Sequence, residues 1–300
     1  MIRTPLEEFT GQAPIIKRLV ETLLFSSRED QPLPHVMLFG SPGLGKSLIA
    51  ELYADAGARE MITLTPPFKP AAIDTAMMNL EGWGIIFLDE VHAMSRKDQD
   101  QLLITLEKRE VMVHTTAIAM PEISFMAATT DPQMVGRPFL ERFGVVETLE
   151  PYPHDDMIEV AQQMFEERVD VDEEHLEALA YASGGIPRRM RHLADEYWRQ
   201  VVMGEVDIAE TIRRCRLTPS GFTMDEVAYM RQLASAAAVS IATGVGEANL
   251  RAALGYSRQD LLELEQRLIA QGLVVRTRSG RSLTALGHTE ARKITQSVAV

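Results

Sequence analysis

The sequence is poor in cysteine and has no long apolar run, and both absences narrow what the protein can be. Its single cysteine, Cys215, excludes an internal disulfide framework and is typical of a reducing compartment. We expect this thiol to behave as a small buried hydrophobe. The longest weakly polar stretch, ASAAAVSIATGVG, is too short to span a bilayer, and the first ten residues carry no secretion signal. These observations predict a cytoplasmic protein without a membrane partner.

Positive charge is also scarce, because 30 Lys and Arg face 43 Asp and Glu and leave a net charge of −13. A chain this acidic is not expected to coat nucleic acid generally. The excess of acidic residues is unevenly distributed, since the segment from Thr223 to Val300 holds nine Lys and Arg against seven Asp and Glu. An acidic body with a mildly basic tail suits a protein whose contacts with DNA are local.

The order of apolar segments divides the chain into three predicted domains. Residues 1–150 alternate helix-like segments with five short apolar runs, VMLF, MITL, IIFL, ISFMAA and VVETL. Such runs indicate a parallel sheet that helices cover on both faces. Residues 151–222 are predicted to form successive helices. Residues 223–300 are predicted to form three helices and a β-hairpin that turns at Ser279-Gly280, which is typical of a winged-helix module.

A glycine-rich loop follows the first apolar run, in HVMLFGSPGLGKSLIA. It satisfies the phosphate-binding pattern G-x-x-x-x-G-K-[ST] from Gly40 to Ser47, between a predicted strand and a predicted helix. Glycines let backbone N–H groups surround phosphates, Lys46 can bridge the β- and γ-phosphates, and the Ser47 hydroxyl can bind Mg²⁺. The sequence therefore predicts a site for ATP and Mg²⁺. The residues expected to contact the nucleotide here are Gly43, Leu44, Gly45, Lys46, Ser47 and Leu48.

Two carboxylates follow another apolar run, in GIIFLDEVHAM. Because ligands bind at the carboxyl ends of parallel strands, Asp89 is predicted to hold Mg²⁺ with Ser47, and Glu90 to orient or deprotonate the attacking water. The next strand, ISFMAATT, ends in two hydroxyls that could hold this water, with Thr130 the first choice and Thr129 the second. His92 is either a structural turn residue or a link from the nucleotide to a neighbouring loop.

Arginines in two further segments suit the spread charge of a phosphoryl group in transfer. FLERFG places Arg142 before the last strand, with Arg137 five residues earlier. GGIPRRMRHL places Arg188 after a glycine turn, at the start of a helix. Chemistry alone leaves ordinary surface arginines as an equal alternative for both sites.

The predicted hairpin near the end of the chain is rich in arginine. Three arginines lie within six residues with no acid between them, and such a cluster can neutralise DNA phosphates without reading bases. A solvated hairpin with three charges is the alternative. The residues are Arg276, Arg278 and Arg281.

Together these motifs resemble the AAA+ ATPases, and within them the RuvB family of Holliday-junction branch-migration motors. The resemblance is carried, in the family's order and over nearly the whole chain, by Arg3 with LEEFTGQ, HVMLFGSPGLGKS, DEVH, ATTD, FLERFG, GIPR and QGLVVRTRSGR. It implies an α/β AAA+ P-loop core, a helical lid and a C-terminal winged-helix domain. It also implies a hexameric ring that hydrolyses ATP to move double-stranded or branched DNA.

The resemblance implies roles at matching positions only. Thr130 would be the first nucleotide sensor and Arg188 the second, while Arg142 would be an arginine finger that reaches the site of the neighbouring subunit. The residues that would border the adenine are Phe9, Thr10, Tyr152 and Pro187.

The sequence departs from the family at three places. Glu141 precedes a single Arg142 where the family has two arginines, and Asp131 replaces the arginine after Thr-Thr. The segment KREVMVHTTAIAMPEIS is shorter than the family's hairpin for the junction-binding partner RuvA. We expect a hairpin to survive as EVMVHTTAIAM, but docking of a RuvA-type partner is left open. The alternative function is an ATP-switched assembly factor that clamps DNA and loads a helicase, clamp or recombinase without translocation.

Overall fold

The computed structural model describes residues 6–80, 83–108, 110–113, 116–119, 122–166, 168–239 and 244–297. Arg3, which contributes to the family resemblance, lies outside the described residues. The chain forms two compact units, residues 1–152 and 153–300, and each is described by itself. Among the described residues, no helix combines the length and apolar character that crossing a membrane requires.

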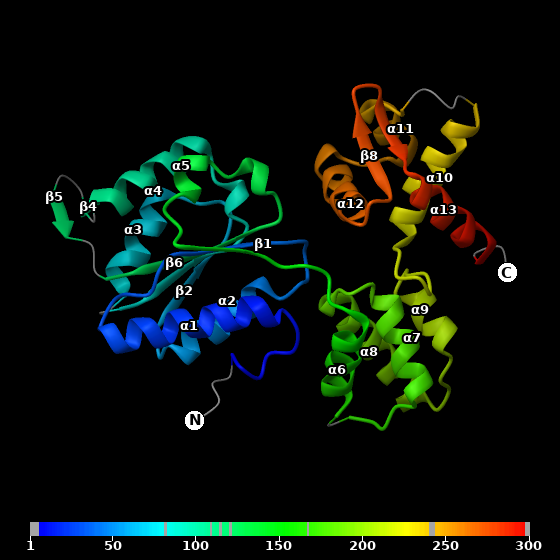
Figure 1. Cartoon of the computed structure of the whole chain (residues 1–300), viewed down its shortest axis with the longest axis horizontal. Helices are drawn as coiled ribbons and strands as arrows, with labels where there is room; N and C mark the ends of the chain where they lie inside the picture. Colours follow the sequence, from blue (N-terminus) through cyan, green and yellow to red (C-terminus); the bar gives the residue numbers. More distant parts are fainter. Residues whose placement is uncertain are drawn as a thin grey trace. The chain divides into compact units, whose positions relative to one another are not determined.

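The first unit is built on a five-stranded parallel sheet with strand order β2-β3-β6-β1-β7 (Figure 1). Its strands coincide with the five apolar runs of the sequence, so the predicted parallel sheet is confirmed. Every residue of β3 and β6 is buried, as expected of central strands with helices on both faces. The strands are β1 (Val36–Phe39), β2 (Met61–Leu64), β3 (Ile85–Leu88), β6 (Ser124–Thr129) and β7 (Val145–Thr148).

Helices cover this sheet on both faces, with α1 and α2 on one side and α4 and α5 on the other (Figure 1). Two 3₁₀ turns, η1 (Val91–Ala93) and η2 (Pro132–Met134), follow β3 and β6. A separate antiparallel pair, β4 (Glu110–Val113) with β5 (Thr116–Ala119), confirms the expected hairpin. The helices are α1 (Ala13–Glu29), α2 (Lys46–Ala56), α3 (Pro70–Asn79), α4 (Arg96–Lys108) and α5 (Arg137–Leu140).

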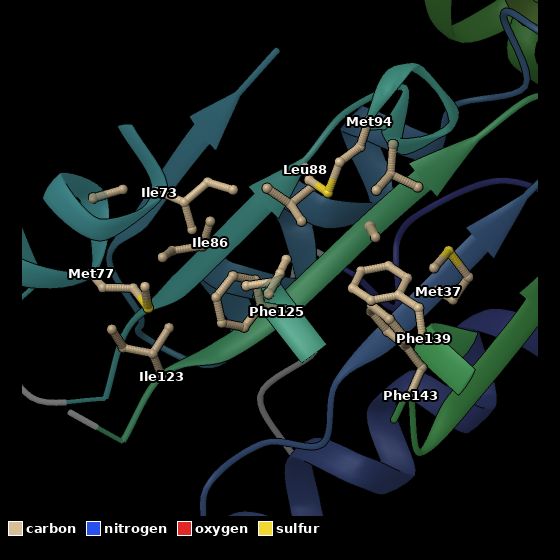
Figure 2. Packing of buried hydrophobic residues seen from close by; sticks show 14 of the residues in the cluster. Met37, Ile73, Met77, Ile86, Leu88, Met94, Ile123, Phe125, Phe139 and Phe143 are labelled. Atoms are coloured by element: carbon tan, nitrogen blue, oxygen red, sulfur yellow. The ribbon is translucent and has the colours of Figure 1, made fainter. Parts of the chain in front are cut away.

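A buried apolar cluster supports the strand ends that carry the predicted site. Leu88 and Phe125 of the central strands pack with α3, α4 and α5 in this cluster (Figure 2). Phe139 and Phe143 meet edge to face, with ring centroids 5.2 Å apart. Burying a side chain of this size stabilises the fold by about 1.5–3 kcal/mol. This packing therefore holds the carboxyl ends of β3 and β6 in place.

The second unit begins with four helices, as the sequence predicted for residues 151–222. The second and third of these helices each end at a glycine. Gly184 and Gly204 adopt left-handed conformations at these two C-termini. The helices are α6 (His154–Phe165), α7 (Glu173–Ser183), α8 (Pro187–Met203) and α9 (Ile208–Arg214).

The rest of the second unit contains three helices, a hairpin and a further helix around a common core. The last helix, α13 (Ala285–Ser297), was not predicted, because the buried hydrophobic residues among its described side chains, Ala291 and Ile294, are too few to make a clear helical pattern. The assignment of this segment as a winged-helix DNA-binding module stays a prediction. The other elements are α10 (Met224–Val239), α11 (Glu247–Leu254), α12 (Arg258–Ala270), β8 (Val274–Thr277) and β9 (Gly280–Leu283).

The turn of this hairpin lies one residue earlier than predicted. Thr277 pairs with Gly280, so the turn consists of Arg278 and Ser279. Gly280 is needed for another reason, since a Cβ there would lie only 2.5 Å from the carbonyl oxygen of Val245. The glycine permits close backbone packing against the preceding segment and does not form the turn itself.

Candidate ATP site and DNA-binding wing

The glycine-rich loop joins β1 to α2 at the carboxyl end of the sheet. Gly40, Gly43 and Gly45 all have positive φ, which L-residues rarely adopt. A Cβ on Gly40 would lie 2.9 Å from the carbonyl oxygen of Leu149, and one on Gly45 would lie 3.3 Å from the ring of Phe9. A side chain at Gly40 or Gly45 would therefore crowd these neighbours, so the shape of the loop requires glycine at both positions.

Lys46, the first residue of α2, has its ammonium group inside this loop. The side chain is 6% exposed, and Nζ donates to the carbonyl oxygens of Gly40 at 2.7 Å and Ser41 at 3.1 Å. Burying an ammonium is costly unless an anion or strong acceptors compensate it. A phosphate group is the anion that this position and charge would suit, so the residues present fit ATP.

Ser47 and Asp89 meet at the end of β3. The Ser47 hydroxyl donates to Oδ2 of Asp89 at 3.2 Å, although the two residues are 42 positions apart. Both supply oxygen atoms, which Mg²⁺ prefers, and the ion usually keeps several waters and phosphate oxygens as its other ligands. This donor pair fits the predicted metal position.

Glu90 follows Asp89 in a left-handed conformation, with φ of 56°. For a non-glycine residue this conformation is strained, and such strain is concentrated at functional sites. Oε2 of Glu90 accepts a hydrogen bond from the Thr130 hydroxyl at 3.3 Å and lies 3.2 Å from Nδ1 of His92. The carboxylate is thus oriented from two sides while it stays partly open to solvent.

The two threonines at the end of β6 have different surroundings. Thr129 is fully buried, and its hydroxyl accepts from the backbone N–H of Asp131 at 3.0 Å and lies 3.1 Å from Nδ1 of His92. Thr130 instead directs its hydroxyl to Glu90. This geometry favours Thr130 as the residue beside the attacking water. His92 does more than form a turn, since it connects Glu90 with Thr129.

The predicted adenine border is partly assembled in the first unit. Phe9 lies over Gly45, and the buried Tyr152 donates from its hydroxyl to the carbonyl oxygen of Leu44 at 3.3 Å. Thr10 follows Phe9 and is half-buried, whereas Leu48 is exposed on α2. Pro187 belongs to the second unit, so its place at the adenine stays a prediction.

Gln12 has a structural role that the sequence reasoning missed. Its side-chain amide donates from Nε2 to the carbonyl oxygen of Glu150 at 2.7 Å and thereby ties the N-terminal segment to the chain just after β7. Gln12 also adopts φ of 51° at the start of α1. Its position in the Gly-Gln pair of the resemblance was the available signal.

Arg142, the predicted finger, is half-exposed after α5 and pairs with Glu107 at the end of α4. Arg137 is almost fully exposed and lies 3.3 Å from Glu141, one helical turn away. Exposed ion pairs contribute only about 0–1 kcal/mol, so the pair with Glu107 leaves Arg142 free to exchange partners. Arg188, the second residue of α8, is exposed in the second unit.

The three hairpin arginines are not equivalent. Arg276 and Arg281 both donate from Nε to the carboxylate of Glu265, at 2.8 Å and 3.0 Å. Glu265 is fully buried on α12 and also accepts from the hydroxyl of Tyr229 at 2.9 Å. Burial, and then the charge of Glu265, raise the pKa of Tyr229. Arg278, at the turn, is exposed.

Arg281 has a second acidic partner as well. Its Nη2 donates to Oε2 of Glu247 at 3.0 Å, and this hydrogen bond lowers the pKa of Glu247. Two of the three arginines predicted to bind DNA are therefore largely neutralised within the protein. The sequence showed no acid between the arginines, but the acids come from α11 and α12.

Comparisons with known proteins agree with this site. Residues 2–149 match the family model described as the Holliday junction DNA helicase RuvB P-loop domain. The P-loop part of the chain belongs to the RuvB family. A RuvB-type P-loop domain is an ATPase that uses ATP with Mg²⁺, and the glycine-rich loop, the Ser47–Asp89 pair and Glu90 lie within the matched residues.

RuvB proteins are also similar to the chain beyond this domain. The Holliday junction branch migration complex subunit RuvB of Borreliella afzelii is 28% identical over 94% of this chain and 86% of its own length. The corresponding subunit of Bdellovibrio bacteriovorus is 28% identical over 93% of this chain and 89% of its own length. The RuvB Holliday junction branch migration motor of Thermotoga maritima superposes with a TM-score of 0.83, covering 97% of each chain at 23% identity. At that identity the superposition shows the fold.

Proposed function

We propose that this protein is a RuvB-type motor, which hydrolyses ATP to drive branch migration of Holliday junctions as a ring around double-stranded DNA. The observation that carries the proposal is the cluster of Lys46, Ser47, Asp89 and Glu90 at the carboxyl end of the sheet, in a chain similar to RuvB over nearly its whole length. The ring, the partner protein and the DNA contacts follow from the resemblance and are part of the proposal.

The site residues divide the chemistry among them. The loop N–H groups and Lys46 bind the phosphates, and Ser47 and Asp89 hold the metal ion. Bound Mg²⁺ neutralises phosphate charge. Glu90, held by Thr130 and His92, orients the attacking water and accepts its proton. Arg142 supplies positive charge to the site of the next subunit, and exchange of its Glu107 partner for phosphate makes it available.

An ATP-switched loader or clamp is the second candidate function, and the β4–β5 hairpin favours it. The segment that forms this hairpin is shorter than the family's hairpin for the partner RuvA, so docking of a RuvA-type partner stays a proposal. The β8–β9 hairpin favours the motor instead. Because Glu265 and Glu247 neutralise Arg276 and Arg281, its grip on phosphates is weaker than three free charges would give, and a motor must bind and release DNA repeatedly.

The deciding experiment is ATP-dependent conversion of a synthetic four-way junction into duplex products. The full chain is tested alone and with a RuvA-type partner. The control variant is Glu90→Gln, which keeps the shape of the side chain and the loop residues but removes the carboxylate. Conversion by the wild type, lost in the control, supports the motor. DNA-stimulated hydrolysis without conversion would reject the motor in favour of the loader.

A further inference from the structure

Among the buried charged residues of the second unit, three lie on α10 and α12. Glu226 is 3%, Arg267 5% and Glu265 0% exposed. Removing such groups from water is costly, and they are tolerated only when their partners are well placed. Glu226 lies in the first turn of α10, while Glu265 and Arg267 lie near the end of α12. The partners of these residues lie on α8 and on the β8–β9 hairpin, so the charged residues connect these two parts of the unit.

Arg267 forms the centre of one cluster. Its Nη1 donates to both carboxylate oxygens of Glu226, at 2.7 Å and 2.6 Å, and its Nη2 donates to the carbonyl oxygen of Gly221 at 2.9 Å. Arg189 of α8 donates from Nη1 to the same carbonyl at 2.9 Å, and its Nη2 lies 3.5 Å from Glu226. Helices α8, α10 and α12 are therefore joined through one carboxylate and one carbonyl.

The turn before α8 is pressed against this cluster. A Cβ on Gly184 would lie 2.4 Å from Nη2 of Arg267, and one on Gly221 would lie 2.8 Å from the Cα of Gly184. Both glycines also have positive φ. The start of α8 can therefore shift little without breaking contacts in the cluster. Arg188, the predicted nucleotide sensor, is the second residue of that helix.

The charge at the start of α8 also depends on this cluster. The first turn of α8 contains arginines and no acid, although the positive end of the helix dipole disfavours cations there. Burial, followed by the charge of Arg267, lowers the pKa of Arg189, and Glu226 opposes this effect. The carboxylate of Glu226 thus stabilises a helix start that would otherwise carry only positive charge.

On α12 the path continues to the hairpin. Glu265 precedes Arg267 by two residues, and residues at this spacing point to different sides of a helix. Glu265 holds Arg276 and Arg281 of the two hairpin strands, and Arg278 forms the turn between those strands. One helix therefore connects the cluster beside Arg188 with the hairpin that presents Arg278.

We propose that Glu226 and Arg267 are positioning residues that couple the nucleotide sensed by Arg188 to the DNA bound by the hairpin. The inference rests on the proposed function, because both end points are predicted contacts. The buried ion pairs make α8, α10, α12 and the hairpin move together. A change of nucleotide that shifts Arg188 consequently shifts Arg278, and DNA bound at the hairpin shifts Arg188 in return.

The test measures DNA affinity in two nucleotide states. Fluorescence anisotropy gives the Kd of a labelled four-way junction with ADP and with a non-hydrolysable ATP analogue. We expect the two values to differ about 5- to 150-fold in the wild type, the usual range of such coupling. In the double variant Arg267→Met with Glu226→Gln, the two values should become nearly equal. The readout is the ratio of the two Kd values, because a defect that only weakens DNA binding would raise both values and leave their ratio unchanged.

Matched variants separate coupling from folding. The double substitution removes both charges of the Glu226–Arg267 pair together, which proteins tolerate better than one unpaired buried charge. Arg189 loses a carboxylate partner but is 20% exposed and keeps its hydrogen bond to the carbonyl oxygen of Gly221. Arg267→Lys keeps the charge but cannot hold Glu226 and Gly221 in the same planar geometry, so it should retain part of the coupling. The control is Arg168→Met with Asp195→Asn, an exposed ion pair that also involves α8. It should leave the ratio of affinities unchanged.

Two outcomes would overturn the inference. One is a folded double variant, with a wild-type thermal transition, whose affinity ratio equals that of the wild type. The other is a wild type whose DNA affinity is the same in both nucleotide states. Neither outcome decides the proposed function, because the junction-conversion experiment tests that separately with the wild-type chain.

Discussion

At the scale of single residues, hydroxyl groups near Glu90 define how the carboxylate is held. Thr130 bonds to Glu90 directly, whereas Thr129 satisfies the buried N–H of Asp131. His92 lies within hydrogen-bonding distance of both Glu90 and Thr129. The two neighbouring threonines therefore have different tasks, which their side-chain chemistry alone could not distinguish.

Thr130→Val tests the catalytic task. Valine keeps the shape of the side chain but cannot donate to Glu90, so kcat should fall about 10- to 100-fold while ATP binding is retained. Steady-state hydrolysis and the binding of a fluorescent nucleotide measure the two effects. Thr129→Val should instead lower the free energy of unfolding by about 1–3 kcal/mol, because the N–H of Asp131 loses its acceptor. The reverse pattern would transfer the catalytic role to Thr129.

Cys215 differs from the expectation of a small buried hydrophobe. It is only half-buried, and its Sγ donates to the carbonyl oxygen of His192 at 3.5 Å. Burial, and then the charge of Glu196, nevertheless raise the pKa of the thiol to about 11. The thiol is therefore partly accessible to solvent, but its raised pKa makes it unreactive at neutral pH.

The raised pKa of Cys215 predicts slow thiol chemistry at neutral pH. A thiol with pKa near 11 is ionised to about 0.1% at pH 8, so it should react about two orders of magnitude more slowly than free cysteine. The rate should rise roughly tenfold for each pH unit up to pH 10. The absorbance change with Ellman's reagent measures this rate. A rate at pH 8 equal to that of free cysteine would contradict the prediction.

At the scale of elements, the β8–β9 hairpin behaves as part of the packed second unit. Val245 pairs with Arg281, and the carboxylates of Glu247 and Glu265 hold the arginines at the base of the hairpin. The turn residue Arg278 remains exposed. The hairpin is therefore preorganised, and its arginines are expected to contribute unequally to DNA binding.

Arg278→Ala should lower the salt dependence of DNA binding. Each phosphate contact contributes about 0.9 to the slope of log K against log salt concentration, so the slope should fall by about one. Arg281→Ala should change the slope less, because two carboxylates already balance its charge. Duplex binding between low and moderate salt measures both slopes. Arg278→Lys, which keeps the charge, and Arg292→Ala, an exposed arginine on α13, serve as controls. Equal changes for Arg278 and Arg281 would show that the ion pairs open on DNA.

The β4–β5 hairpin is the other element on which function depends. Its antiparallel pairing confirms that a hairpin remains where the family resemblance places partner docking. Glu107, the partner of Arg142, lies on α4 just before this hairpin. The element that could receive a partner is thus close in sequence to the residue that holds the predicted finger.

At the scale of the whole molecule, the ATP site requires a neighbour if Arg142 acts in trans. Arg142→Ala should leave ATP binding unchanged but lower kcat about 10³- to 10⁵-fold, the usual effect of losing an arginine finger. Mixed with wild-type chains, the variant should reduce turnover by more than its share of the subunits. ATPase assays over a range of mixing ratios measure this effect. A proportional decrease would contradict poisoning of the ring, and normal turnover of the variant would place the finger elsewhere, with Arg137 the next candidate.

The sequence by itself determined the central sheet and the ATP-binding loop. Short continuous apolar runs bounded by turns are typical of strands in a sheet that helices cover on both faces, and the glycine, lysine and serine spacing is local to one loop. Asp89 and Glu90 could be placed because they follow directly on a buried strand. These predictions depended on neighbours in the chain, which a sequence displays.

The tertiary structure alone decided which arginines form ion pairs with carboxylates and which stay exposed to solvent. Glu265 reaches Arg276 and Arg281 because α12 packs behind the hairpin, and Glu107 reaches Arg142 across 35 positions of the chain. The cluster of Glu226, Arg267 and Arg189 likewise arises only when three helices meet. The electrostatic effect of a charged side chain depends on its distance to other charges in space and on its burial. Neither quantity is defined until the helices have packed.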